Sequence, residues 1–287
     1  MSVPGKGLQA DTSVATPIVG VVRFSVLTAG PSDFRGTAKL TIEERARVLF
    51  DPAHLETRFK TFEALTLPSL TSQTVDDWHA VILFSDRLPT PWRDRLMDLT
   101  APHPHILPVE MSVEASIAPV LHQTALSLST GTADRVAMFR IDDDDGLSSG
   151  FVRRLRDVAD HAGQRRVGIT FPRGYLLGRH SDGERMLALA PFRRFGIGCG
   201  LTVVGPSAPD FGVFDLGVPH QRIDEIIPTL SDSHAPNYVI FLHDHNDSGQ
   251  DTRRHAQIRK ADAIQPRAAA RKLGDDFAHL RLDMLVD

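Results

Sequence analysis

Three apolar runs of strand length recur in the first half of the chain, and segments with helical spacing separate them. The runs cover residues 18–27, 78–85 and 135–141 and are rich in β-branched side chains. Runs that are apolar on both faces are typical of a parallel sheet covered by helices. The alternation of strand and helix therefore predicts an α/β fold with a mostly parallel sheet flanked by helices.

The segment between the first two runs has the pattern of an amphipathic helix. Asp51 and Pro52 suit the unpaired amides of a first helical turn, and Leu55 and Phe59 then recur at helical spacing. We expect Pro68 to end or kink this helix, because proline has no amide proton to donate.

Beyond residue 165 the chain changes to short strand-like segments separated by glycine and proline. From residue 249 onward it becomes rich in arginine and alanine, as a helical segment would be. We therefore expect a disordered lead-in over residues 1–17, one domain with a strand-rich second half over residues 18–248, and a C-terminal helical extension over residues 249–287.

Composition excludes several classes of function. A formal net charge of −4 over 287 residues leaves no basic face of the kind that binds nucleic acid. The apolar runs are far shorter than the roughly 20 residues that cross a bilayer, so we expect no integral membrane segment. The chain has one cysteine, Cys199, which excludes an internal disulfide and favours a cytoplasmic location.

The third apolar run ends in four consecutive aspartates, Asp142, Asp143, Asp144 and Asp145. Carboxylates this close repel one another and raise one another's pKa. A divalent cation would compensate them, and Mn²⁺ or Mg²⁺ held by one or two carboxylates completes its shell with substrate phosphates. At the carboxyl end of a strand, the run therefore predicts a diphosphate site. The alternative is a solvated turn that caps the next helix, for which one or two acids would suffice.

Residues 139–147 resemble the D-x-D element of GT-A glycosyltransferases. Over roughly residues 18–248 the chain also resembles bacterial proteins named as rhamnosyltransferases, in the stretches 23–26, 62–74, 171–175 and 243–248. The resemblance implies a GT-A, Rossmann-like fold. It also implies transfer of a sugar from a nucleotide-diphosphate donor to a saccharide or other hydroxyl acceptor, with a divalent cation; the sugar itself is left open.

The resemblance also implies roles for the four acids. Asp142 would face the nucleotide ribose, Asp144 would bind the metal, and Asp145 would support the site or touch the sugar. The register of the motif can shift by one residue, which makes Asp143 a further nucleotide-binding candidate.

Two more strand ends carry candidates for the nucleotide pocket. Arg23, Phe24 and Ser25 on the first run would line it, and Asp86 falls where these enzymes place an acid against the base. In this chain the residues around Asp86 depart from the usual Asp-Gly-Ser form of such a position.

Late histidines are candidates for closing the metal shell. His243 and His245 follow an apolar run at alternate positions, so they would point to the same side of an extended segment. GT-A enzymes frequently take a metal ligand from a late histidine, which favours one of these two. The alternative is a pair of surface histidines at a strand end.

An inverting transferase needs a base for the acceptor hydroxyl, whereas a retaining one does not. His220 and Asp224 are the candidates by position, and the alternative places both on the polar side of an amphipathic helix. Two other functions compete with sugar transfer. Metal-dependent phosphoester hydrolysis also uses Asp and His clusters, and a non-catalytic module would bind a nucleotide sugar without turnover.

Overall fold

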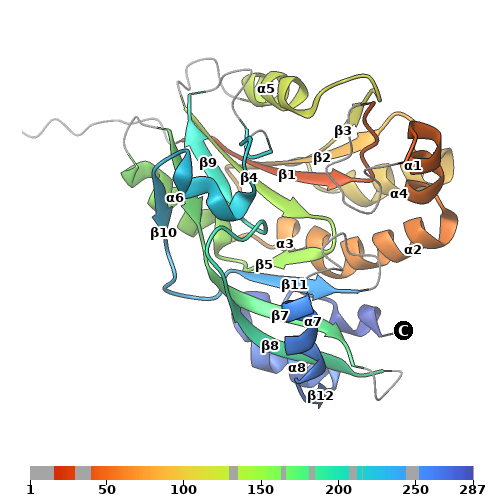
Figure 1. The fold of residues 1–287 in the computed structure, drawn as a ribbon, viewed down its shortest axis with the longest axis vertical. Helices are drawn as coiled ribbons and strands as arrows, with labels where there is room; N and C mark the ends of the chain where they lie inside the picture. The colour runs from red at the N-terminus through yellow and green to blue at the C-terminus, as the bar shows by residue number, and fades with distance from the viewer. Residues whose placement is uncertain are drawn as a thin grey trace, which may run out of the picture.

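The structure is a computed structural model, and it describes residues 16–29, 40–128, 135–162, 166–180, 185–206, 212–214, 216–243 and 252–286. Most of the predicted lead-in, residues 1–15, lies outside these ranges. Two sheets form the body of the described chain, with helices around them (Figure 1). None of its described helices is both long and apolar enough to cross a membrane.

The larger sheet has seven strands in the order β10-β6-β9-β4-β1-β2-β3. They are β1 (Ile18–Phe24), β2 (His79–Ser85), β3 (Ile106–Met111), β4 (Val136–Asp142), β6 (Val167–Thr170), β9 (Thr202–Gly205) and β10 (Thr229–Ser231). Only β9 runs antiparallel to its neighbours, β4 and β6. The predicted α/β class with a mostly parallel sheet is confirmed, and β1, β2 and β4 all end at one edge of the sheet.

The smaller sheet has five strands in the order β12-β8-β7-β11-β5. They are β5 (Asp145–Leu147), β7 (Arg173–Arg179), β8 (Leu187–Arg193), β11 (Tyr238–Leu242) and β12 (Ala263–Ile264). β11 runs parallel to β7 and antiparallel to β5. Its last strand, β12, comes from the predicted C-terminal extension and pairs with β8.

Helices cover both faces of the larger sheet (Figure 1). The α-helices are α1 (Ile42–Leu49), α2 (Pro52–Thr61), α3 (Leu67–Thr71), α4 (Thr90–Thr100), α5 (Ile117–Leu128), α6 (Phe151–His161), α7 (Thr252–Arg259) and α8 (Pro266–Leu273). A π-helical turn, η1 (Phe62–Thr66), lies between α2 and α3, and the 3₁₀ turns are η2 (His220–Glu225), η3 (Asp275–Phe277) and η4 (Leu282–Leu285).

Alternate residues of β1 enter two separate cores, as a strand covered on both faces requires. Val22 and Phe24 pack with Phe59 of α2, whereas Val19 and Val21 pack with the α5 side. A third core lies between the smaller sheet, η1 and the C-terminal segment. The three cores are therefore arranged around the place where the chain passes from β4 into β5.

Several boundaries differ from those expected. The helix that begins at Pro52 does not end at Pro68 but continues to Thr71 through η1. The first strand stops at Phe24. α1 was not predicted from the sequence, although Thr41 and Glu44 form a capping box at its start. Residues 220–225 form a 3₁₀ turn and not an amphipathic α-helix.

Candidate active site

The acidic run joins the two sheets. Asp142 is the last residue of β4, Asp143 and Asp144 form a turn, and Asp145 is the first residue of β5. The run thus lies at the carboxyl edge of the larger sheet, where α/β proteins collect ligands. Asp143 and Asp145 are buried, at 6% and 5% exposure, whereas the side chain of Asp142 is 45% exposed.

Asp144 meets His243 across this turn. β11 pairs with β5 in antiparallel register, Ile240 opposite Asp145, so the chain leaving β11 returns alongside the turn. His243 Nε2 lies 3.0 Å from Asp144 Oδ2, and the two side chains are 14% and 16% exposed. The structure therefore brings together two of the three predicted metal ligands. The third, His245, lies outside the described residues.

Arginines compensate two of the other acids. Arg58 of α2 donates to Asp143 Oδ2 at 2.6 Å, and Arg140 of β4 donates to Asp142 Oδ1 at 2.9 Å. Burial outweighs Arg58 and raises the pKa of Asp143 to about 7. Burial also acts to raise the pKa of Asp142, but the charges of Arg140 and Arg23 outweigh it and lower that pKa. The repulsion expected from the sequence is thus relieved in part by the protein itself.

Asp145 lies deepest of the four. Its burial, together with the charges of Asp144 and Asp142, raises its pKa well above the usual value. Cys199 is also buried, and its burial, together with the charge of Asp145, raises the pKa of its thiol. Cys199 Sγ donates to Gly146 O at 3.8 Å, so this thiol is packed against β5.

The end of β1 contains a polar atom without a partner. Ser25 is 1% exposed and has a positive φ of 51°, and its Oγ makes no hydrogen bond within the described residues. Strained backbone and unpaired buried polar atoms gather at functional sites. Arg23 stacks on the ring of Phe214 at 4.8 Å, but Phe24 is wholly buried and packs in the core against Phe59 and Phe62.

Asp86 follows β2 at the same edge of the sheet. Its side chain is exposed and accepts from Ser85 Oγ at 3.3 Å, and its backbone amide donates to Met111 O. The structure thus places Asp86 beside the end of β3, at the same edge as Ser25.

The two candidate bases lie in different environments. His220 Nδ1 lies 2.7 Å from Gly196 O, which can only accept, so Nδ1 carries the proton and Nε2 accepts from Gln221 Nε2 at 3.1 Å. Burial lowers the pKa of His220, and Asp142, Arg140 and Arg194 are close enough to influence it. Asp224 is exposed on η2, so the structure places only His220 near the acidic run.

The Asp144 and His243 pair fits a divalent cation. His243 Nε2 and Asp144 Oδ2 lie at a hydrogen-bond distance of 3.0 Å, and adjacent ligand atoms of an octahedral ion with bonds of about 2.1 Å have about the same separation. Among the described residues, no group of three or more His, Cys, Asp or Glu side chains could hold a metal ion. The remaining ligands of such an ion would come from substrate phosphates and water, as is usual for Mg²⁺, or from residues outside the described ranges, such as the predicted ligand His245.

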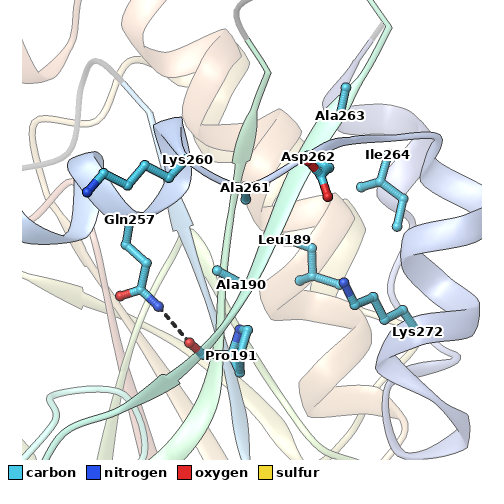
Figure 2. A pocket seen from close by; sticks show the side chains of 10 residues that line it. All are labelled: Leu189, Ala190, Pro191, Gln257, Lys260, Ala261, Asp262, Ala263, Ile264 and Lys272. Carbon is cyan, nitrogen blue, oxygen red and sulfur yellow. Dashed lines mark hydrogen bonds between the residues drawn. The ribbon is translucent and has the colours of Figure 1, made fainter.

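A pocket of about 460 Å³ lies elsewhere, between β8 and the C-terminal segment (Figure 2). Its lining includes Gln257, Lys260, Asp262 and Lys272, and Gln257 donates to Pro191 O across it. None of the predicted site residues that the structure describes lines it.

Sequence reasoning missed the residues that support the acidic run. Arg58 and Thr66, from the helix before β2, contact it directly. Thr66 lies in the stretch 62–74 on which the family resemblance rests. That resemblance marked the stretch but could not show what it touches, because the two segments are 79 residues apart.

By family, the chain is a glycosyltransferase. The chain belongs to the family described as "Putative rhamnosyl transferase", whose model matches residues 17–255. No curated protein matches it in sequence.

The solved structures of similar fold share little sequence with this chain. S. aureus TarS 1–349 in complex with UDP-GlcNAc is 10% identical, with a TM-score of 0.46, over 86% of this chain and 68% of that one. The match to the TarS structure that is not limited to residues 1–349 covers 40% of that TarS chain, at 10% identity and a TM-score of 0.42. The mannosyltransferase PcManGT from Pyrobaculum calidifontis, in complex with GDP-Man and Mn²⁺, is 10% identical, with a TM-score of 0.39, over 95% of this chain and 69% of that one. Likeness at this level does not extend to substrates.

Proposed function

We propose that this protein transfers a sugar from a nucleotide-diphosphate donor to a hydroxyl acceptor with the help of Mn²⁺ or Mg²⁺. The observation that carries the proposal is the Asp144 and His243 pair at the carboxyl edge of the larger sheet. Membership of a glycosyl transferase family supports the reaction type. The single cysteine, buried as a thiol, fits the reducing environment of the cytoplasm, where we place the reaction.

Different residues at the carboxyl ends of these strands bind different parts of the donor. Asp144 and His243 would hold the cation, which when bound would supply positive charge beside the diphosphate leaving group. Asp142, oriented by Arg140, receives the ribose. Ser25 and Asp86 face the base from the ends of β1 and β2, and Arg23 lies beside them. Asp143 and Asp145 keep the turn in shape and do not contact the donor.

His220 is the base that we propose for inverting transfer. Its lowered pKa keeps the ring neutral near pH 7. Nδ1 is bound to Gly196 O, so Nε2 can take a proton once the acceptor hydroxyl replaces Gln221 Nε2, which lies 3.1 Å from it. The acceptor oxygen bonds to the anomeric carbon as the bond from that carbon to the diphosphate breaks. The acceptor proton passes to Nε2, and the nucleoside diphosphate leaves.

The proposal is tested by thermal unfolding with UDP, GDP and dTDP, each with and without Mn²⁺. A ligand at 100 times its dissociation constant stabilises the native state by about 2.7 kcal/mol, which for a chain of this size is a shift of roughly 5 °C or more. We expect one nucleotide to give this shift only with Mn²⁺.

Asp144→Asn should abolish the metal-dependent shift and donor turnover together, because it removes one of two protein ligands. Asp98→Asn is the matched control, since Asp98 is exposed on α4, away from the site. Unchanged binding and turnover in Asp144→Asn would remove the metal from the proposal. Release of free sugar at full rate without acceptor would instead indicate a hydrolase.

A further inference from the structure

One continuous helix, residues 52–71, lies against the acidic run. This 52–71 helix comprises α2, η1 and α3. Near its start, Arg58 donates to the carboxylate of Asp143. Near its end, Ser69 Oγ accepts from Leu147 N at 2.9 Å, just after the run. Between these two contacts lies Thr66.

Thr66 differs from the other hydroxyl residues of the 52–71 helix. Thr57, Thr61, Ser69 and Thr71 each donate to a carbonyl oxygen of their own helix, three or four residues earlier. That is the usual bond of a hydroxyl inside a helix. Thr66 Oγ1 instead donates to Asp145 O at 2.8 Å, with Asp142 O at 3.3 Å. The residue is wholly buried.

Pro68 explains why the helix is distorted at Thr66. In a regular α-helix, Ala64 O would accept from the amide of residue 68, but proline has none and its ring crowds that carbonyl. The chain widens there into the π-helical turn η1, in which Leu67 N donates to Phe62 O. Ala64 O accepts instead from Arg281 N at 2.9 Å. π-Helical turns of this kind are frequent at functional sites.

The two carbonyls that Thr66 contacts lie on either side of the turn formed by Asp143 and Asp144. One hydroxyl proton shared between Asp142 O and Asp145 O holds the two ends of this turn at a fixed separation. The backbone of Asp144 is thereby held, and with it the direction of the carboxylate that meets His243.

We infer that Thr66 is a positioning residue for the metal-binding carboxylate of Asp144, acting through the backbone of the acidic turn. The expected effect of Thr66 on metal affinity rests on the proposed function. Groups that orient metal ligands typically account for 10–100-fold in metal affinity. The side chain of Thr66 itself touches neither metal nor donor.

The test compares Thr66→Val, Thr66→Ser and Thr61→Val in the full chain. Valine keeps the shape of threonine but has no hydroxyl, and serine keeps the hydroxyl. Thr61 is the matched control, because it is buried in the same helix but bonds only carbonyls of its own turns. Apparent Mn²⁺ affinity is measured from nucleotide-dependent thermal stabilisation. We expect Thr66→Val to lose about tenfold or more, and the other two variants to stay within about threefold of wild type.

Amide hydrogen exchange without any ligand gives a second readout. Thr66→Val should exchange faster over residues 143–148 than wild type, while Thr66→Ser and Thr61→Val should not. Wild-type exchange and wild-type Mn²⁺ affinity in Thr66→Val would overturn the inference. If wild-type protein binds no Mn²⁺ with any nucleotide, the proposed function fails, and the exchange measurement still decides whether Thr66 holds the turn.

Discussion

Arg140, Arg58 and His243 each meet a different aspartate of the run from Asp142 onward. Three of the four carboxyl groups therefore face separate partners even though they are adjacent in sequence. Burial raises the pKa of Asp143 and Asp145, which removes part of their negative charge near neutral pH. Asp144 is therefore the acid of the run that the proposed cation would chiefly compensate.

The pH dependence of stability follows from His220. Its pKa is lowered in the folded state, so the unfolded chain binds a proton that the folded chain resists. Its contribution to stability is present above the unfolded pKa of about 6.5 and is lost as pH falls below that value, by at most about 1.4 kcal/mol per pH unit. His220→Asn should show a smaller loss of stability between pH 6.5 and 5 than wild type, measured by urea unfolding.

The comparison with wild type is needed because other groups contribute over the same range. The lowered pKa values of His79 and His279 act in the same direction as that of His220. The raised pKa values of Asp143 and Asp145 act in the opposite direction, since these folded carboxyls take up protons before unfolded ones do. Parallel curves for wild type and His220→Asn would show that folding does not lower the pKa of His220.

For single residues, the sequence predicted where a side chain lies better than which side chains it contacts. The pairing of Asp144 with a late histidine was expected, because strand ends and residue types are visible in the sequence. The partners Arg58 and Arg140 were not expected, because an arginine has no periodicity that distinguishes an ion pair from a solvated side chain. Phe24 was assigned to the nucleotide pocket, and its side chain lies in the core.

At the scale of elements, β1 and β4 are held together by a fit between glycine and an aromatic ring. Gly20 lies opposite Phe139 in the parallel register, and a Cβ at this position would overlap the ring. Phe139 also packs edge-to-face with Phe151 of α6, with ring centroids 4.9 Å apart. The absence of a side chain at Gly20 thus makes room for a contact between the sheet and a helix.

Gly20→Ala should therefore destabilise the fold by roughly 1–3 kcal/mol, as overpacked cores do. Phe139→Leu added to it should recover part of this loss, although the same substitution alone is destabilising. The free energies from chemical unfolding of the two single variants and the double variant form a cycle. Additive effects would show that the ring and residue 20 do not contact.

Helices and strands were predicted well where a pattern of apolar residues extended over many positions. They were predicted poorly where the chemistry of one residue decided the structure. The strands over 79–85 and 136–142 and the α5 and α6 helices follow directly from runs of apolar residues. Pro68 was expected to end or kink a helix, because its missing amide is a local property, and the helix is distorted before it by the π-helical turn η1. The helix continues because Arg281, more than 200 residues later, supplies the hydrogen bond that proline leaves unmade.

At the scale of the whole molecule, the C-terminal segment completes a core. Phe277 is 1% exposed and packs with Tyr175 of β7 at 6.0 Å between ring centroids. Leu273 and Leu280 join the same cluster, which also holds Ala64 and Leu65 of η1. The segment is thus packed on the smaller sheet and on the helix that supports the acidic turn.

Phe277→Ala should cost about 3–5 kcal/mol, as large-to-small changes in cores do, and should lower the melting temperature by roughly 6 °C or more. Asp275→Ala, at an exposed position of the same 3₁₀ turn, is the control and should have little effect. Calorimetry of both variants checks this. Equal melting temperatures would mean that the segment contributes nothing to the core.

The chain crosses from one sheet to the other within the acidic turn itself, between the end of β4 and the start of β5. The pair of donor atoms on Asp144 and His243 therefore exists only after both sheets have formed and docked, with partners 99 residues apart. Contacts of such long range are among the last to be made during folding, because closing the intervening loop is entropically unfavourable. The appearance of metal-dependent nucleotide binding during refolding should accordingly report the completion of the native state and not an earlier collapse.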